Sequence, residues 1–237
     1  EIDNQVFLGS KAYYLKKLYL NDFPVPPGFV ITTEVFRRLN SIMKIQSLYD
    51  EIENLIRYHI SELERLTGLE YGNPEKPLLM SVRSGAAISM PGAMNTFLNV
   101  GMNDEITEAL SKKDNYPWTS WDCYRRLLQT WGMAYGLDRN DFDNIMLEYK
   151  AKYDIQRKID FNPKIMREIA FAYKKHLEDN NITFESDPFK QIMQAVLSVF
   201  NSWNSARAKV YREHMQIADE WGTAVIIQQM IFGNLHK

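Results

Sequence analysis

The chain has 237 residues, of which 45% are hydrophobic and 24% are charged, and its formal net charge is −2. These proportions are typical of a globular protein, and the length suffices for one large domain or two modest ones. A net charge this close to zero argues against binding through bulk charge to nucleic acid or to an anionic membrane surface. We therefore expect neither of these partners.

The cysteine content and the hydropathy of the chain indicate the compartment in which we expect the protein. Cys123 is the only cysteine, so an internal disulfide is excluded and a reducing compartment is favoured. No apolar run approaches the roughly 18 residues of a membrane span, and the start of the chain lacks the pattern of a signal peptide. We therefore expect a cytoplasmic protein. The chain also lacks an initiator Met, which predicts that it is a fragment.

The first third of the chain predicts helices around one strand. Gly9-Ser10-Lys11 precedes apolar residues at helical spacing, with Ser10 as the expected N-cap. The prolines of residues 24–27 enforce an extended turn, which the strand-like residues 29–32 follow. A helix is expected after Thr33, and residues 47–66 have the periodicity of a long amphipathic helix.

Lys11 is a candidate phosphate ligand. It would sit in the first turn of its helix, where the positive end of the helix dipole disfavours a cation. A nearby anion would remove this conflict. The commoner alternative is a solvated surface lysine.

Residues 81–96 form the most unusual stretch, and they follow a short apolar run, residues 77–80, that predicts a buried strand. The stretch holds one arginine, two glycines and four hydroxyl side chains. Bare backbone N–H groups, small side chains and one fixed positive charge are the components of a polyphosphate cradle. The alternative is an ordinary connection in which Gly and Pro only shape turns.

The middle of the chain predicts a helical insert. Residues 121–135, 141–153 and 163–177 have helical periodicity, and no convincing strand lies between residues 104 and 179. The aromatic side chains Trp121, Tyr124, Trp131 and Tyr135 fit a core better than a platform for stacked bases. After the insert, a single long helix is expected from Asp187 to Tyr211, and residues 222–233 form the strongest strand pattern of the chain.

Several catalytic chemistries are excluded by their missing motifs. The four histidines and one cysteine lack metal-ligand spacing, and the sequence holds no P-loop, dinucleotide fingerprint or Gly-x-Ser-x-Gly elbow. What remains is an anion site made of Lys11, Arg83 and residues 85–96. Beside it, the apolar residues 225–231 could present backbone groups to a flat heterocycle.

Four ordered motifs resemble the N-terminal ATP-binding region of the pyruvate, phosphate dikinases. They are Gly9-Ser10-Lys11 with PVPPGFVITTE (24–34), SVRSGAAISMPGAMNTFLNVGMND (81–104), SWNSARAKVYR (202–212) and GTAVIIQQMIFGN (222–234). The resemblance implies an α+β fold: an ATP-grasp-type lobe with a mixed sheet flanked by helices, plus an all-helical insert. Its first part would span residues 1–104, the insert 105–183, and the return to the lobe 184–237, with the ATP-grasp unit truncated at its C-terminus.

The resemblance also implies residue roles. Lys11 and Arg83 match the phosphate-binding lysine and arginine and would be the catalytic residues. Gly92, Ala93, Asn95 and Thr96 match the loop over the phosphates, and Gln229, Met230 and Ile231 match the adenine-binding linker. The two cations would neutralise the triphosphate, and fixed N–H donors would stabilise the transferring group.

In the family, ATP phosphorylates a histidine on a separate domain, which then phosphorylates pyruvate in a barrel. The overall reaction converts ATP, pyruvate and phosphate to AMP, phosphoenolpyruvate and diphosphate. The resemblance therefore implies ATP and those two domains as partners, leaves a homodimer open, and implies Mg²⁺ whose ligands lie outside this chain.

Three departures from the family pattern leave alternatives open. Ser10 and Ala12 replace glycines of the family's Gly-Gly-Lys-Gly, and Asn95 replaces an aspartate. The third departure is the truncation, so we expect this fragment alone to be inactive. The alternatives are a degenerate nucleotide-binding or regulatory module, and the ATP-binding part of a phosphoenolpyruvate synthase.

Overall fold

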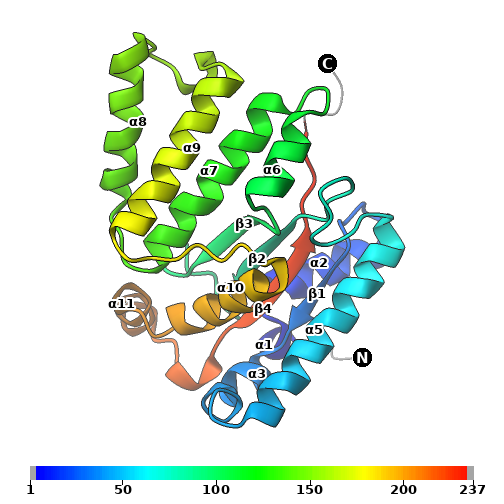
Figure 1. The fold of residues 1–237 in the computed structure, drawn as a ribbon. Helices are drawn as coiled ribbons and strands as arrows, with labels where there is room; N and C mark the ends of the chain where they lie inside the picture. Colours follow the sequence, from blue (N-terminus) through cyan, green and yellow to red (C-terminus); the bar gives the residue numbers. More distant parts are fainter. Residues whose placement is uncertain (1–3, 234–237) are drawn as a thin grey trace.

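A computed structural model describes residues 4–233, and its centre is a four-stranded sheet of order β1-β4-β2-β3 (Figure 1). The strands are β1 (Gly28–Ile31), β2 (Met80–Gly85), β3 (Thr96–Val100) and β4 (Ala224–Gln229). The α+β class is confirmed. Every strand pair of this sheet is antiparallel, whereas a mixed sheet was expected.

Helices make up most of the rest of the chain. They are α1 (Gln5–Leu8), α2 (Ser10–Leu20), α3 (Thr33–Arg37), α4 (Leu39–Ile42), α5 (Gln46–Thr67), α6 (Asp104–Ser111), α7 (Pro117–Ala134), α8 (Arg139–Tyr153), α9 (Pro163–Asp179), α10 (Pro188–Ser202) and α11 (Ala206–Met215). In the described part of the chain, no helix combines the length and apolar character needed to cross a membrane.

The two faces of the sheet have different partners. Val225 and Ile227 of β4 join the main core with Val199 of α10, whereas Ile226 and Gln228 point to the opposite face, beside α2. This alternation follows from the two-residue period of a strand. Figure 1 shows α10 lying across the sheet and the helices α6–α9 gathered above it. One face of the sheet is therefore buried under the core. The other face is partly covered by α2 and partly borders a cavity.

The middle helices continue the main core. Trp131 of α7 contacts Phe97 of β3 edge-on, with ring centroids 5.7 Å apart, so one core runs from the sheet into the helices. Trp121, Tyr124 and Trp131 are buried as expected, but Tyr135 at the end of α7 is 51% exposed. The proposed limits of the insert, residues 105–183, stay a prediction.

The observed elements differ from the expected ones at three places. Residues 81–85, expected in a loop, belong to β2, because β3 and β4 pair with them from both sides. The expected long helix ends at Ser202 and restarts as α11, where Ser205 accepts a hydrogen bond from the Ala208 amide (3.2 Å). Gly9, not Ser10, caps α2, since the Ser10 hydroxyl donates to the Ala86 carbonyl.

A buried ion cluster ties α7 to the segment before α9. Asp122 accepts hydrogen bonds from Arg125 (2.8 and 3.0 Å) and from the Lys158 ammonium (2.9 and 3.0 Å), and it pairs with Arg126 at 3.0 Å. Burial alone would raise the pKa of the Asp122 carboxyl, but Arg125 and Lys158 together hold that pKa below its usual value of 3.8. The cluster therefore depends on an ionised Asp122.

Replacing Asp122 with Asn should lower the free energy of unfolding by about 3–5 kcal/mol at neutral pH, because it leaves buried cations without their counter-charge. The folded carboxyl binds its proton less tightly than the unfolded one. Its stabilisation is therefore complete above the unfolded pKa near 3.8 and disappears as the pH falls through the lower folded value. Urea unfolding from pH 7 to pH 2.5 measures both effects.

The matched control is Asp179→Asn, which removes an exposed carboxylate paired with Lys175 at 2.7 Å. We expect the control to change stability by about 0–1 kcal/mol. Equal losses in the two variants would contradict a structural role for the buried cluster.

Candidate functional site

Lys11 and the glycine loop, which we define as residues 86–95, line one small cavity of about 140 Å³. Its walls come from three segments that are distant in sequence. These are the start of α2 (Ser10 and Lys11), the end of β2 (Ser84 and Gly85), and the glycine loop with Thr96. The structure thus brings together residues that the sequence places about 80 positions apart.

Two glycines allow the start of α2 to approach β2 this closely. Gly9 has a φ of +76°, and a Cβ there would lie 1.6 Å from the Gly85 carbonyl oxygen. The Ser10 amide and hydroxyl both donate to the Ala86 carbonyl, at 3.0 and 3.1 Å. Ser10 in place of the family's glycine is therefore accommodated by a hydrogen bond at the rim of the cavity.

Arg83 lies midway along β2, opposite Ile226 on one side and Thr96 on the other. Its Nη2 donates to the Gln228 Oε1 at 2.6 Å, while its buried Nε has no hydrogen-bond partner among the described residues. Burial lowers the pKa of the Arg83 guanidinium. An incoming anion nearby would offset the cost of this desolvated charge.

The two cations lie close enough to influence each other. Partial burial, followed by the positive charge of Arg83, lowers the pKa of Lys11. Within residues 4–233, neither cation forms an ion pair with a carboxylate. The site is therefore electropositive and uncompensated, in contrast to the cations that surround Asp122.

Helices α10 and α11 hold the glycine loop from behind. The Asn95 amide donates to the Ser202 hydroxyl and its side chain to the Ser198 hydroxyl, both at 3.1 Å. Arg207 donates to the Gly92 carbonyl at 3.0 Å. The Ala93 amide donates to the Met90 carbonyl at 3.2 Å. Of the four predicted loop residues, Gly92 and Thr96 line the cavity, whereas Ala93 and Asn95 are engaged in hydrogen bonds within the protein.

The predicted adenine linker lies at the other end of the strands. Gln229 is the last residue of β4, and its amide donates to the Pro27 carbonyl at 3.0 Å. The Met230 amide donates to the Leu79 carbonyl at 2.8 Å, and Ile231 is 60% exposed. These three residues do not line the cavity that contains Lys11.

Strand register places the linker and the cavity at a defined separation. Met80 pairs with Gln229 at one end of β2, and Gly85 pairs with Ala224 at the other. Five residues of strand correspond to about 17 Å. The sheet therefore offers a phosphate-sized cavity and a stretch of backbone at opposite ends of one strand pair.

Gln228 is the polar residue that the sequence reasoning missed. It is 5% exposed and lies on the same face as Arg83, where its Nε2 donates to the Pro26 carbonyl at 2.9 Å. It also borders a second, larger cavity of about 530 Å³ between α2, β1 and the end of α5. The alternation of the strand could have found it, because Gln228 falls two residues after Ile226 on the non-core face.

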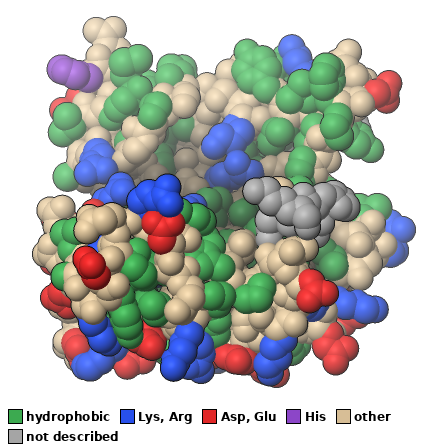
Figure 2. Space-filling model, turned by 90° about the horizontal axis from the view of Figure 1, so that it is seen from above, with side chains coloured by type: hydrophobic (Ala, Val, Ile, Leu, Met, Phe, Trp, Pro, Cys, Tyr) green, Lys and Arg blue, Asp and Glu red, His purple; other side chains and the backbone are tan. Residues whose placement is uncertain are grey.

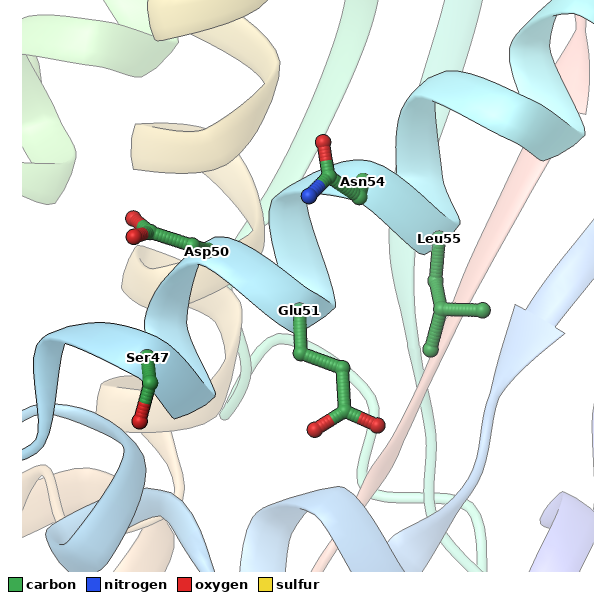
Figure 3. A pocket seen from close by; sticks show the side chains of 5 residues that line it. All are labelled: Ser47, Asp50, Glu51, Asn54 and Leu55. Atoms are coloured by element: carbon green, nitrogen blue, oxygen red, sulfur yellow. The ribbon is translucent and has the colours of Figure 1, made fainter.

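The surface has other hollows, and the one on α5 fits a nucleotide poorly. Figure 3 shows Ser47, Asp50, Glu51, Asn54 and Leu55, all on α5, around a pocket that carries two carboxylates and no cation. Figure 2 shows Lys and Arg side chains bordering a hollow on one face, with acidic side chains nearby. Within residues 4–233, no group of three or more His, Cys, Asp or Glu side chains is arranged to hold a metal ion.

Replacing Gly9 with Ala should lower the free energy of unfolding by about 2–4 kcal/mol, because the new Cβ combines a backbone conformation restricted to glycine with overpacking against β2. Urea unfolding measures the loss. The control is Gly68→Ala, where φ is also positive (+68°) but a Cβ would meet nothing within 4 Å. If the two variants lost the same stability, close approach to Gly85 would not be what positions Lys11.

Comparison with known proteins gives the family of the chain, while the roles of the individual site residues stay predictions. The family model described as "Pyruvate phosphate dikinase, AMP/ATP-binding domain" matches residues 38–236. The chain is 37% identical over 230 residues to "Pyruvate, phosphate dikinase" of Clostridium symbiosum, covering 96% of this chain and 26% of that protein. It is 39% identical over 237 residues to "Pyruvate, phosphate dikinase, chloroplastic" of Flaveria pringlei, covering 98% of this chain and 24% of that protein.

These alignments also reach the residues before position 38, because they cover nearly the whole chain. The chain spans about a quarter of the length of the curated relatives it matches. Their names include chloroplastic proteins, so the cytoplasmic location stays a prediction. The family predicted from the four motifs is confirmed: the chain belongs to the family of the pyruvate phosphate dikinase AMP/ATP-binding domain.

Proposed function

We propose that this chain is the ATP-binding part of a pyruvate, phosphate dikinase, and that it presents ATP to a histidine on another domain. The observation that carries the proposal is a pair of neighbouring cations without a compensating carboxylate among the described residues. Lys11 lines the glycine cavity, whereas Arg83 does not line it but lies close enough to lower the pKa of Lys11. A triphosphate is the ligand that such a site suits, since it supplies the missing negative charge.

The chain's own residues would act mainly by binding and orienting the nucleotide. Lys11 and Arg83 would neutralise the triphosphate, with Gly92 and Thr96 as the walls of its cavity. The base would lie toward Gln229, Met230 and Ile231, about 17 Å along the strands, a span suited to an extended nucleotide. Ala93 and Asn95 would hold the loop rather than contact phosphate.

The partner domains and the metal belong to the same proposal. A phospho-histidine domain and a pyruvate-binding barrel would come from the complete dikinase, and a homodimer stays a prediction. Mg²⁺ would supply further charge neutralisation at the phosphates from ligands outside the described residues. No step assigned to Lys11 or Arg83 depends on its position.

A degenerate binding module is the second candidate, and Asn95 favours it. This side chain replaces the family's aspartate and is hydrogen bonded to Ser198, so it brings no carboxylate to the cavity. Phosphoryl transfer in the complete protein separates the two candidates, because a degenerate module would bind the nucleotide without transferring phosphate.

In the complete dikinase, Arg83→Ala should reduce phosphorylation of the histidine by ATP by a factor of about 10² or more, because a charge that stabilises the transferring group is lost. Phosphoryl exchange between phosphoenolpyruvate and the same histidine should be unchanged. Radiolabel transfer in the two half-reactions measures both rates. Arg65→Ala is the charge-matched control, since Arg65 forms an exposed ion pair with Glu62 on α5. Equal losses in both half-reactions would show that Arg83 is structural.

The isolated chain should bind ATP only weakly, because a cavity of about 140 Å³ is too small to enclose a nucleotide and leaves much of it in water. Isothermal titration calorimetry at low ionic strength is the measurement, and we expect a dissociation constant well above 1 μM, corresponding to less than about 8 kcal/mol of binding free energy. A dissociation constant below 1 μM would contradict the expectation of weak binding.

A further inference from the structure

We infer that Gln228 is a positioning residue that fixes the Arg83 guanidinium for phosphate while leaving its positive charge uncompensated. The inference rests on the function proposed above and adds a specific role for a buried glutamine. Gln228 contacts Arg83 directly, with 2.6 Å between the Nη2 donor and the Oε1 acceptor.

The proline-rich turn determines which way the Gln228 amide faces. The Nε2 group donates to the Pro26 carbonyl at 2.9 Å, and the adjacent Gln229 amide donates to the Pro27 carbonyl at 3.0 Å. A carbonyl can only accept and a guanidinium can only donate, so both partners require the same orientation of the amide. The turn therefore aims the Gln228 oxygen at Arg83.

A neutral acceptor has a particular advantage at this position. A carboxylate would also orient the guanidinium, but it would cancel the charge that attracts a triphosphate and would compete with phosphate for the same donors. Gln228 uses one of the five N–H donors, and the buried Nε has no partner among the described residues. The arrangement orders the side chain and still leaves donors and charge for a ligand.

If Gln228 had a purely structural role, the Glu and Leu variants at this position would rank differently in their affinity for ATP. If Gln228 only filled space beside Arg83, Gln228→Glu would weaken ATP binding less than Gln228→Leu, since Glu keeps the shape and the bond to Arg83 and loses only the bond to Pro26. The positioning role predicts the reverse for nucleotide binding. Glu should weaken binding more than Leu does, because it adds a neutralising charge.

The experiment titrates ATP, from micromolar to several millimolar, into the full 237-residue chain and follows it by NMR. We expect Gln228→Leu to weaken ATP binding about tenfold, equivalent to 1.4 kcal/mol, and Gln228→Glu to weaken it further. Binding by the Glu variant should recover as the pH is lowered and the new carboxyl becomes protonated. The matched control is Gln191→Leu. Gln191 is also buried and bonded to backbone groups, accepting from Gly101 at 2.7 Å and donating to Met102 at 3.0 Å. We expect it to change ATP affinity less than twofold.

Equal weakening by Gln228→Leu and Gln191→Leu, or wild-type affinity in Gln228→Glu, would overturn the inference. A second readout needs no ligand: the Arg83 guanidinium protons should exchange with water several-fold faster in Gln228→Leu than in wild type. Unchanged exchange would overturn the inference even if ATP binds. If wild type showed no ATP-dependent shifts at Lys11 or Arg83, the proposed function would fail. The exchange measurement would still decide whether Gln228 holds Arg83.

Discussion

The antiparallel pairing of β2 with β4 is the interaction on which the rest of the molecule depends. It places Val82 opposite Ile227 and Arg83 opposite Ile226, so that alternate residues of both strands face opposite sides. Val82 and Ile227 enter the core under α10, and Arg83 faces away from it. A slip of one residue would exchange the two sets and bury the guanidinium in the core, which makes the register costly to change.

The candidate site is an assembly of segments around the end of this strand pair. Gly9 lets the start of α2 reach Gly85, which sets the place of Lys11. Hydrogen bonds from α10 and α11 hold the glycine loop, through Asn95 and Gly92. The helices thus do more than cover the sheet, since they position the backbone that lines the cavity.

Charge compensation distinguishes the cations around Asp122 from the candidate ligands Lys11 and Arg83. Arg125 and Lys158 share the Asp122 carboxylate, which makes their partial burial tolerable. Arg83 has the Gln228 amide instead, and Lys11 lies close enough to Arg83 for the like charge to lower the pKa of Lys11. Two neighbouring cations that have no counter-ion within residues 4–233 lower the stability of this region, and an anionic ligand would remove that cost. Uncompensated charge on a framework held in place by neutral hydrogen bonds is what we expect of a region that binds a polyphosphate.

The sequence by itself determined the family, the α+β class, the helices α5 and α7 to α9, the strand β4, and the pairing of Lys11 with Arg83 as candidate ligands. These depend on local periodicity or on motifs whose letters are visible in one chain. Only the tertiary structure decided that residues 81–85 form a strand, that the last long helix breaks at Ser202, and that Ala93 and Asn95 bond within the protein. The alternation of β4 could have pointed to Gln228, but its hydrogen-bond partners belong with the features that only the tertiary structure decided. Its partners Arg83 and Pro26 are 145 and 202 residues away, and hydrogen bonds over such distances depend on strand pairing that composition cannot reveal.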